Sequence, residues 1–212
     1  MAVPTNRLIA VAVALLVTVG IVAAIVTEVG NKPRALSARP DSHDSYCAVF
    51  AAATALPPAA PALSGRYANP LYGYAVTIPA GLRGFTPAEG TARGIVIPVS
   101  TTPRALLRVD ASYDQFYDIT AAGVHKRDSV DVRLFDQLLS DQMRPFALAG
   151  VDGGRYRMQV LCRGNPSPYV FDDIVVVRNR EIYRLVLQTE PSRLSADEAL
   201  LDALAGSWGW TR

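Results

Sequence analysis

The sequence predicts an α+β protein, in which an antiparallel β-sheet flanked by helices forms an α/β/α sandwich, preceded by one N-terminal transmembrane helix. Three observations lead to this prediction. An uncharged apolar run lies near the N-terminus, several segments rich in β-branched residues have the length of strands, and two later segments carry apolar residues at helical spacing. Their order is strands, helix, four strands, helix, which favours an antiparallel sheet with helices packed on it.

Four parts divide the 212-residue chain. We expect a short tail at 1–7, a transmembrane signal-anchor helix at 8–27, a Pro/Ala-rich linker at 28–64 with a short helix at 45–56, and a globular domain at 65–212. The domain has about 150 residues, which is enough to bury a core without a metal or several disulfides.

The anchor is predicted from nineteen consecutive uncharged residues at 8–26. As a helix they span about 28 Å, close to the roughly 30 Å hydrocarbon core of a bilayer. The alternative is a cleaved signal peptide, whose apolar region is usually about 7–15 residues long. The small residues at 22–24 would then be the cleavage site. The greater length favours an uncleaved anchor in the inner membrane.

The sequence gives conflicting signals about the side of the membrane on which the globular domain lies. Lys32, Arg34 and Arg39 come after the run whereas only Arg7 precedes it, which favours a cytoplasmic domain. The short tail is typical of a signal-anchor, and an even number of cysteines suits an oxidising compartment. We expect the globular domain to be periplasmic or otherwise extracytoplasmic.

Charge excludes one class of partner. The chain has 21 Lys+Arg and 19 Asp+Glu, and four of the basic residues but only one of the acidic residues lie before position 41. The rest of the chain therefore has 17 basic and 18 acidic residues, a net charge of −1. The globular part therefore lacks the basic surplus of a nucleic-acid-binding protein. The expected partners are the membrane, through residues 8–27, and a protein.

Cys47 and Cys162 allow two interpretations. They form one disulfide, which the chain-entropy account makes stabilising by roughly 3–5 kcal/mol, or they remain two buried thiols. No CxxC occurs, and two cysteines are too few for a structural zinc site. The pair is the candidate disulfide.

The first half of the domain is predicted to contain strands. Residues 67–78 suit two strands around a turn at Asn69-Pro70, and residues 93–99 and 105–111 suit two more. Pro98 places the third strand at a sheet edge or a bulge, because proline has no N–H for a ladder.

A helix is predicted in the middle of the domain. Residues 113–126 are ambiguous and are compatible with a short helix. Apolar residues then recur at helical spacing from Val130 through Leu134 to Leu138, which predicts an amphipathic helix at 128–143.

Two hairpins are predicted in the second half. Asp152-Gly153 is a turn signal between strands at 146–151 and 155–161. Asn179-Arg180 joins a strand at 170–178 to one at 181–189. That last strand is apolar on both faces, which predicts an interior position.

The chain is predicted to end in a helix. Ser195 followed by Glu198 is a capping-box pattern, so the helix should begin at Ser195. Gly206 should end it, and Trp208 follows.

Two segments resemble the ends of Mog1/PsbP-type domains. They read YANPLYGYAVTIPAGL and EIYRLVLQTEPSRLSADEALLDALAGSWGW, and the resemblance extends over residues 65–210. It implies an antiparallel sheet with helices on it. It also implies a mostly non-enzymatic role, since members of that superfamily bind proteins, assist complex assembly or reside in bacterial envelopes. It brings no catalytic residues.

No catalytic motif is present, because the sequence contains no GxSxG, Walker A or GxGxxG pattern. His43 lies in the linker, and His125 lies in the segment VHKRD. A pair of His125 with Cys47 or Cys162 stays open, because such partners meet in space rather than in sequence.

Two patterns of aspartate residues are candidates for a chemical role. Asp110, Asp114 and Asp118 recur every four residues and would suit a hard cation on one helix face, but Asp110 is expected to end a strand. Asp172 and Asp173 are adjacent, so their side chains point to opposite faces and do not form an acid–base pair. We therefore predict no catalytic, cofactor-binding or metal-binding residue.

Tyrosines form the candidate partner-binding surface, because exposed tyrosines are common at interfaces. The alternative is that they pack on the sheet. The candidates are Tyr67, Tyr72, Tyr74, Tyr113 and Tyr117.

The function expected from the sequence is that of a non-enzymatic, membrane-tethered binding or assembly module of the bacterial cell envelope. The alternatives are a toxin-inhibitor or immunity-type protein, and a hydrolase with an unrecognised site.

Overall fold

The computed structural model describes residue 47 and residues 61–86, 94–101, 104–113 and 119–212. The chain divides into two units, Met1–Leu36 and Ser37–Arg212, and every described residue belongs to the second. The expected tail, anchor and most of the linker therefore lie outside the described residues, as does the helix expected at 45–56 apart from Cys47. Within the described part, no helix combines the length and apolar character needed to cross a bilayer.

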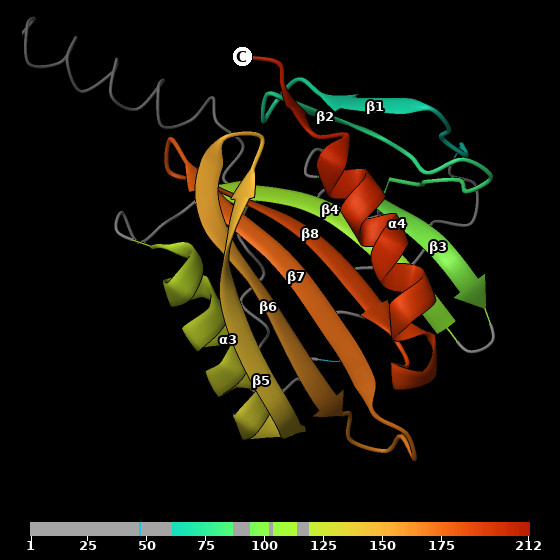
Figure 1. The fold of residues 1–212 in the computed structure, drawn as a ribbon, viewed down its shortest axis with the longest axis vertical. Coiled ribbons are helices and arrows are strands. Elements are labelled where there is room, and N and C mark those ends of the chain that lie inside the picture. The colour runs from blue at the N-terminus through green and yellow to red at the C-terminus, as the bar shows by residue number, and fades with distance from the viewer. Residues whose placement is uncertain (1–46, 48–60, 87–93, 102–103, 114–118) are drawn as a thin grey trace, which may run out of the picture. The chain divides into compact units, whose positions relative to one another are not determined.

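Six antiparallel strands form the main sheet, in the order β3-β4-β8-β7-β6-β5 (Figure 1). They are β3 (Ile95–Thr101), β4 (Arg104–Tyr113), β5 (Gln137–Leu148), β6 (Val151–Leu161), β7 (Tyr169–Arg178) and β8 (Glu181–Thr189). A second, three-stranded sheet has the order β1-β2-β9. Its strands are β1 (Arg66–Asn69), β2 (Tyr74–Thr77) and β9 (Gly209–Trp210). The predicted antiparallel sheet is confirmed.

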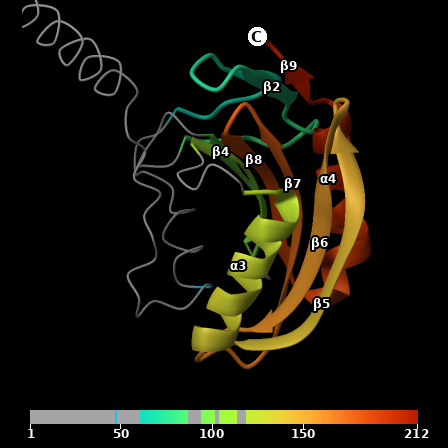
Figure 2. The ribbon, with the colours of Figure 1, turned by 90° about the vertical axis from the view of Figure 1, so that its left-hand side faces the viewer.

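One helix packs on each face of the main sheet. Figure 2 shows α3 (Ala121–Phe135) and α4 (Leu194–Gly206) on opposite sides of the strands. The two faces have separate hydrophobic cores. The core on the α4 side includes Tyr74, Leu107, Leu185, Leu201 and Trp208. The core on the α3 side includes Cys47, Val124, Val132, Cys162 and Val186.

The interior position predicted for the strand at 181–189 is confirmed. β8 lies between β4 and β7. Tyr183 and Leu185 enter the core on the α4 side, whereas Ile182 and Val186 enter the core on the α3 side. Alternation along an extended strand therefore lets one segment serve both cores.

The edge position predicted for Pro98 is confirmed as well. β3 is an outer strand of the main sheet, and its register with β4 shifts between Pro98 and Ser100. A bulge at a sheet edge accommodates a residue that cannot donate a backbone hydrogen bond.

The predicted turn at Asp152-Gly153 is wrong. The turn of this hairpin is Ala149-Gly150, whose φ angles are 46° and 80°. Gly153 lies inside β6, where an added Cβ would come 2.2 Å from the carbonyl oxygen of Val175 on β7. Glycine is therefore required there by the close approach of two strands rather than by a turn.

The predicted helix at 128–143 is wrong in its bounds and in its buried face. α3 begins earlier, where the Thr120 hydroxyl accepts a hydrogen bond from the Gly123 amide at 3.1 Å, and it ends before Asp136. Residues 137–143 belong to β5. Val130 and Leu134, expected in the core, are 46% and 64% exposed. Asp128 and Ser129 are buried instead, because Tyr156 and Arg184 bind Asp128 and Asp141 binds Ser129.

The final helix is confirmed, but its predicted cap is not. A 3₁₀ turn, η1 (Pro191–Arg193), leads directly into α4 at Leu194, and no side chain caps the helix. Glu198 bonds to arginines on β6 rather than back to the helix start.

Candidate functional site

A serine, an aspartate and a histidine meet where α3 crosses β5. The Ser129 hydroxyl donates to Asp141 Oδ2 at 2.8 Å, and His125 Nε2 lies 2.5 Å from Asp141 Oδ1. The carboxylate therefore occupies the middle position. In a nucleophilic triad the imidazole lies between the hydroxyl and the carboxylate, so that it can take the hydroxyl proton. Here the hydroxyl and the imidazole each contact the carboxylate instead, and these contacts join α3 to β5.

A second set of polar groups lies beside the first, beneath the same helix. The Tyr156 hydroxyl donates to Asp128 Oδ2 at 2.5 Å, and Arg184 Nη2 donates to the same oxygen at 2.7 Å. Arg184 Nη2 also bonds to Asp173 Oδ2. The His125 ring centre is 4.7 Å from that of Tyr156, so the two sets adjoin.

Asp173 is the most strongly desolvated carboxyl of this cluster. It is fully buried, and its Oδ1 has no hydrogen-bond partner. Burial raises the pKa of Asp173, and the nearby Asp128 raises it further, whereas Arg184 opposes both. Two carboxylates thus share one guanidinium in a closed environment.

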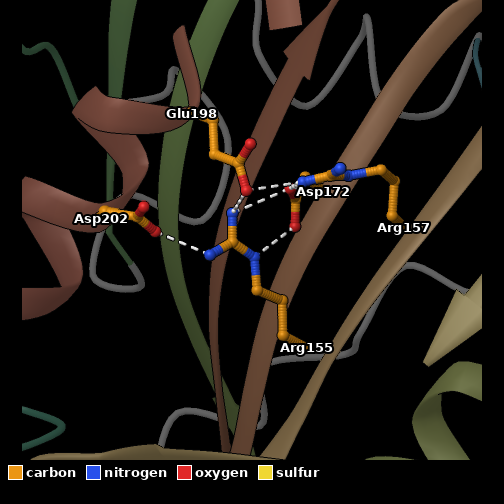
Figure 3. Close-up of polar contacts among 5 residues, drawn as sticks. All are labelled: Arg155, Arg157, Asp172, Glu198 and Asp202. Atoms are coloured by element: carbon orange, nitrogen blue, oxygen red, sulfur yellow. Dashed lines mark hydrogen bonds and ion pairs between the residues drawn. The ribbon is translucent and has the colours of Figure 1, made fainter. Parts of the chain in front are cut away.

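A separate ionic cluster joins the sheet to α4 on the opposite face (Figure 3). Arg155 donates from Nε to Asp172 Oδ1 at 2.7 Å, from Nη2 to Glu198 at 2.8 Å and from Nη1 to Asp202 at 2.6 Å. Arg157 contacts Asp172 and Glu198 as well. Burial lowers the pKa of Arg155, but its bonds to Asp172 and Asp202 outweigh burial and raise that pKa.

The opposite orientation predicted for Asp172 and Asp173 is confirmed. Both are completely buried, one in the cluster on the α4 side and the other in the cluster on the α3 side. Each carboxylate is used to hold a helix or strand in place, so the two do not cooperate in chemistry.

Cys47 and Cys162 form a disulfide with Cα atoms 5.8 Å apart. The neighbouring Asp136 accepts hydrogen bonds from the Cys47 amide at 3.4 Å and from the Arg163 amide at 3.0 Å. No thiol is therefore left for a pair with His125. The bridge ties the segment around Cys47 to the end of β6.

The prediction that the candidate tyrosines form an exposed surface is wrong for two of them. Tyr74 and Tyr72 are buried in the core on the α4 side, where the Tyr74 ring stacks on Trp208 at 4.6 Å between centres. Tyr67 is half-buried against the same core. Tyr113 is half-buried under the Arg180 guanidinium, 5.0 Å from its ring centre, and Tyr117 lies outside the described residues.

The aspartate series does not come together in the described chain. Asp110 bonds to Arg108 at 2.5 Å along β4, while Asp114 and Asp118 lie outside the described residues, as does His43. Among the residues that the structure describes, no three potential metal ligands gather at one place.

Most of the large exposed apolar side chains belong instead to two neighbouring elements, α3 and β5. Within the described chain, four of the five large exposed hydrophobic side chains lie there, and Leu71 is the fifth. The four are Val130, Leu134, Leu139 and Met143. Val130 and Leu134 lie on α3, whereas Leu139 and Met143 lie on β5.

A hollow opens at the outer strand β5. It encloses about 500 Å³ and is lined by Arg133 and residues 136–141. The β5–β6 register shifts between Leu138 and Ser140, which leaves Leu139 at a bulge on the outer strand. We call this feature the β5 hollow. Sequence patterns missed it because Leu139 falls within the helix predicted at 128–143.

Comparisons with known proteins find structural similarity only. No protein-family description and no curated protein matches the sequence. The solution structure of cyanobacterial PsbP (CyanoP) from Synechocystis sp. PCC 6803 has 20% identity and a TM-score of 0.49, covering 74% of this chain and 97% of that one. A crystal structure from Bacteroides thetaiotaomicron VPI-5482 has 10% identity and a TM-score of 0.45 over 70% of this chain and 49% of that one. Similarity at this level assigns no activity.

Proposed function

We propose that this protein is a non-enzymatic, membrane-tethered binding or assembly module of the bacterial cell envelope, which receives a protein partner at the β5 hollow. The observation that carries the proposal is a hollow on the outer strand β5 whose lining includes the exposed apolar side chain of Leu139. Contact surfaces between proteins combine apolar side chains with polar ones around them. The lining of the hollow likewise combines Leu139 with the polar side chains of Arg133 and Gln137.

The tether supports the proposal from the sequence. Nineteen uncharged residues at 8–26 precede a linker with prolines. A domain held on such a linker stays within a shell near the membrane, which raises its effective concentration for a partner there. The disulfide supports an extracytoplasmic domain, because such bonds persist in oxidising compartments.

The geometry of Ser129 supports a non-enzymatic role. Its hydroxyl proton is directed at a carboxylate that also binds His125. A hydrolase would need that proton to reach the imidazole. An active-site serine probe should therefore label the wild-type protein no more than Ser129→Ala.

Site-specific photo-crosslinking in membranes tests the partner. With p-benzoylphenylalanine in place of Leu139, we expect one discrete crosslinked protein after irradiation. The matched control carries the same probe in place of Ala203, which is exposed on α4 on the other side of the sheet. Equal products from both positions, or none from either, would remove the β5 hollow as a docking site.

Reporter fusions test the topology. Fused to the C-terminus, alkaline phosphatase should be active and a fluorescent protein that folds only in the cytoplasm should be dark. The reverse pattern would place the domain in the cytoplasm and contradict the proposed compartment.

A further inference from the structure

The outward face of α3 carries a stripe of basic and apolar side chains. Its buried face includes Ala121, Val124 and Val132. The opposite face presents residues at helical spacing, all of them exposed. They are Lys126, Arg127, Val130, Arg133 and Leu134, which we call the α3 stripe.

The cations of the α3 stripe are largely uncompensated. Elsewhere in the domain arginines such as Arg155 and Arg184 are held by carboxylates. Lys126 and Arg133 make no ion pair or side-chain hydrogen bond within the described part of the chain, and Arg127 comes only within 3.8 Å of Asp128.

The acidic groups near the stripe are directed inward. Asp128 accepts bonds from Tyr156 and Arg184, and Asp141 accepts from Ser129. Asp136 accepts from two backbone amides. Asp131, the remaining acidic residue of α3, is half-buried on the flank of the helix and has an interaction partner. The outward surface is therefore positive around two exposed aliphatic side chains.

We propose that the α3 stripe rests on an anionic lipid surface. Cations flanking exposed Val and Leu on one helix face suit the lipid headgroup region, where the aliphatic groups enter the boundary and the cations meet phosphates. Three cations alone bind such a surface weakly, so this inference rests on the tether proposed above to hold the domain within reach. With α3 on the lipid, the β5 hollow beside it lies at the membrane surface.

Fluorescence quenching in reconstituted vesicles tests the inference on the full chain. Leu134→Cys is labelled with the NBD fluorophore while the native cysteines stay bridged, and the lipid carries brominated chains that quench only at contact. We expect loss of NBD fluorescence in vesicles containing phosphatidylglycerol, much less loss in phosphatidylcholine alone, and recovery at about 1 M salt, where the Debye length is roughly 3 Å. Ala203→Cys on α4 is the matched control and should not be quenched.

A second variant separates lipid contact from mere proximity. Lys126→Gln/Arg133→Gln removes exposed charges without touching either core, so thermal unfolding should not change. Quenching at position 134 should fall toward that of the control. Quenching that is equal at positions 134 and 203, or equal in both lipids, overturns the inference. An acidic protein partner on the stripe would give no quenching in protein-free vesicles, which also overturns it.

The anchor is tested separately by washing the same vesicles with alkaline carbonate. A chain that stays in the vesicles without quenching at position 134 retains its tether and loses only this inference. A chain that washes off contradicts the proposed tether, whatever the quenching shows.

Discussion

Asp173 shows how burial, as the largest of several influences on its pKa, can give a carboxyl group a pH-dependent effect on stability. Below about pH 3.9, the ordinary pKa of aspartic acid, Asp173 is protonated in the folded and the unfolded chain. Burial raises its pKa in the folded chain, so the unfolded chain loses the proton first as the pH rises. Over that window the contribution of Asp173 to the free energy of unfolding falls, and it stays low above the folded pKa.

Replacing Asp173 by asparagine should therefore cost less at neutral than at acidic pH. We expect the free energy of unfolding of wild type minus that of Asp173→Asn to decrease between about pH 4 and pH 7. Urea unfolding at several pH values measures it. Asp152→Asn replaces an exposed aspartate on β6, the neighbouring strand of the main sheet, and should show no such trend. A difference that grows with pH would mean that the Arg184 ion pair, rather than burial, dominates.

Asp172 should behave differently, because it balances two guanidinium groups. Asp172→Asn leaves the buried Arg155 without its bidentate partner and should lower the free energy of unfolding by about 3 kcal/mol. Asp202 belongs to the same cluster but is 55% exposed. Asp202→Asn should cost about 0.5 kcal/mol, as exposed ion pairs do. Chemical denaturation of both variants measures the difference, and equal losses would contradict this account.

At the level of elements, patterns that depend on local chemistry were sufficient to predict structure. The strand at 181–189 followed from the turn signal Asn179-Arg180 and from apolar residues on both of its faces, and Asn179 and Arg180 do adopt positive φ. The edge position of Pro98 followed from its missing N–H. None of these conclusions required knowledge of which surface each segment packs against.

The bounds and the buried face of α3 could not be predicted from periodicity, because that face carries polar Asp128 and Ser129 beside apolar Val124 and Val132. The sequence placed Val130 and Leu134 inward, whereas the sheet receives Asp128 and Ser129. Burial of Asp128 depends on Tyr156 and Arg184, which lie on distant strands and whose positions no local pattern reveals. For the same reason the sequence identified neither the α3 stripe nor the β5 hollow.

The tyrosine hypothesis failed for a related reason. By its sequence, the segment Tyr72-Gly73-Tyr74 is as compatible with an exposed recognition loop as with a strand in the core. The difference is made by Trp208, which lies 134 positions after Tyr74 in the sequence and stacks on it. A contact of that kind depends on how the two ends of the domain meet.

The glycines of β6 allow a test of why the predicted turn was misplaced. Gly153→Ala would force a Cβ to within 2.2 Å of the Val175 carbonyl oxygen and should destabilise the protein by about 3 kcal/mol. Gly206, at the end of α4, has no atom within 4 Å of an added Cβ. Gly206→Ala should therefore be stabilising by about 0.5 kcal/mol. Thermal unfolding distinguishes the two, and a neutral Gly153→Ala would show that the strands can separate there.

At the scale of the whole molecule, one sheet supports two cores that are stabilised differently. The core on the α4 side contains aromatic stacks and no cysteine, and an ionic cluster closes it. The core on the α3 side contains both cysteines, and Asp136 adds hydrogen bonds to the segments around each of them. Among the described residues, β7 and β8 supply buried side chains to both cores.

Removing the disulfide should consequently loosen one side more than the other. Because the cysteines are 115 positions apart in the sequence, the chain-entropy account gives the bond about 5 kcal/mol. In Cys47→Ser/Cys162→Ser, hydrogen exchange should accelerate in α3 and at the Cys162 end of β6, while α4 and β2 exchange nearly as in the wild type. Local opening below the global limit gives this pattern when cooperative units differ in stability. Ser140→Ala, an exposed change in β5, serves as the control and should leave both sides unchanged. If α4 and β2 accelerate as much as α3, the two cores unfold as one unit, and the shared strands transmit the loss of the bridge across the sheet.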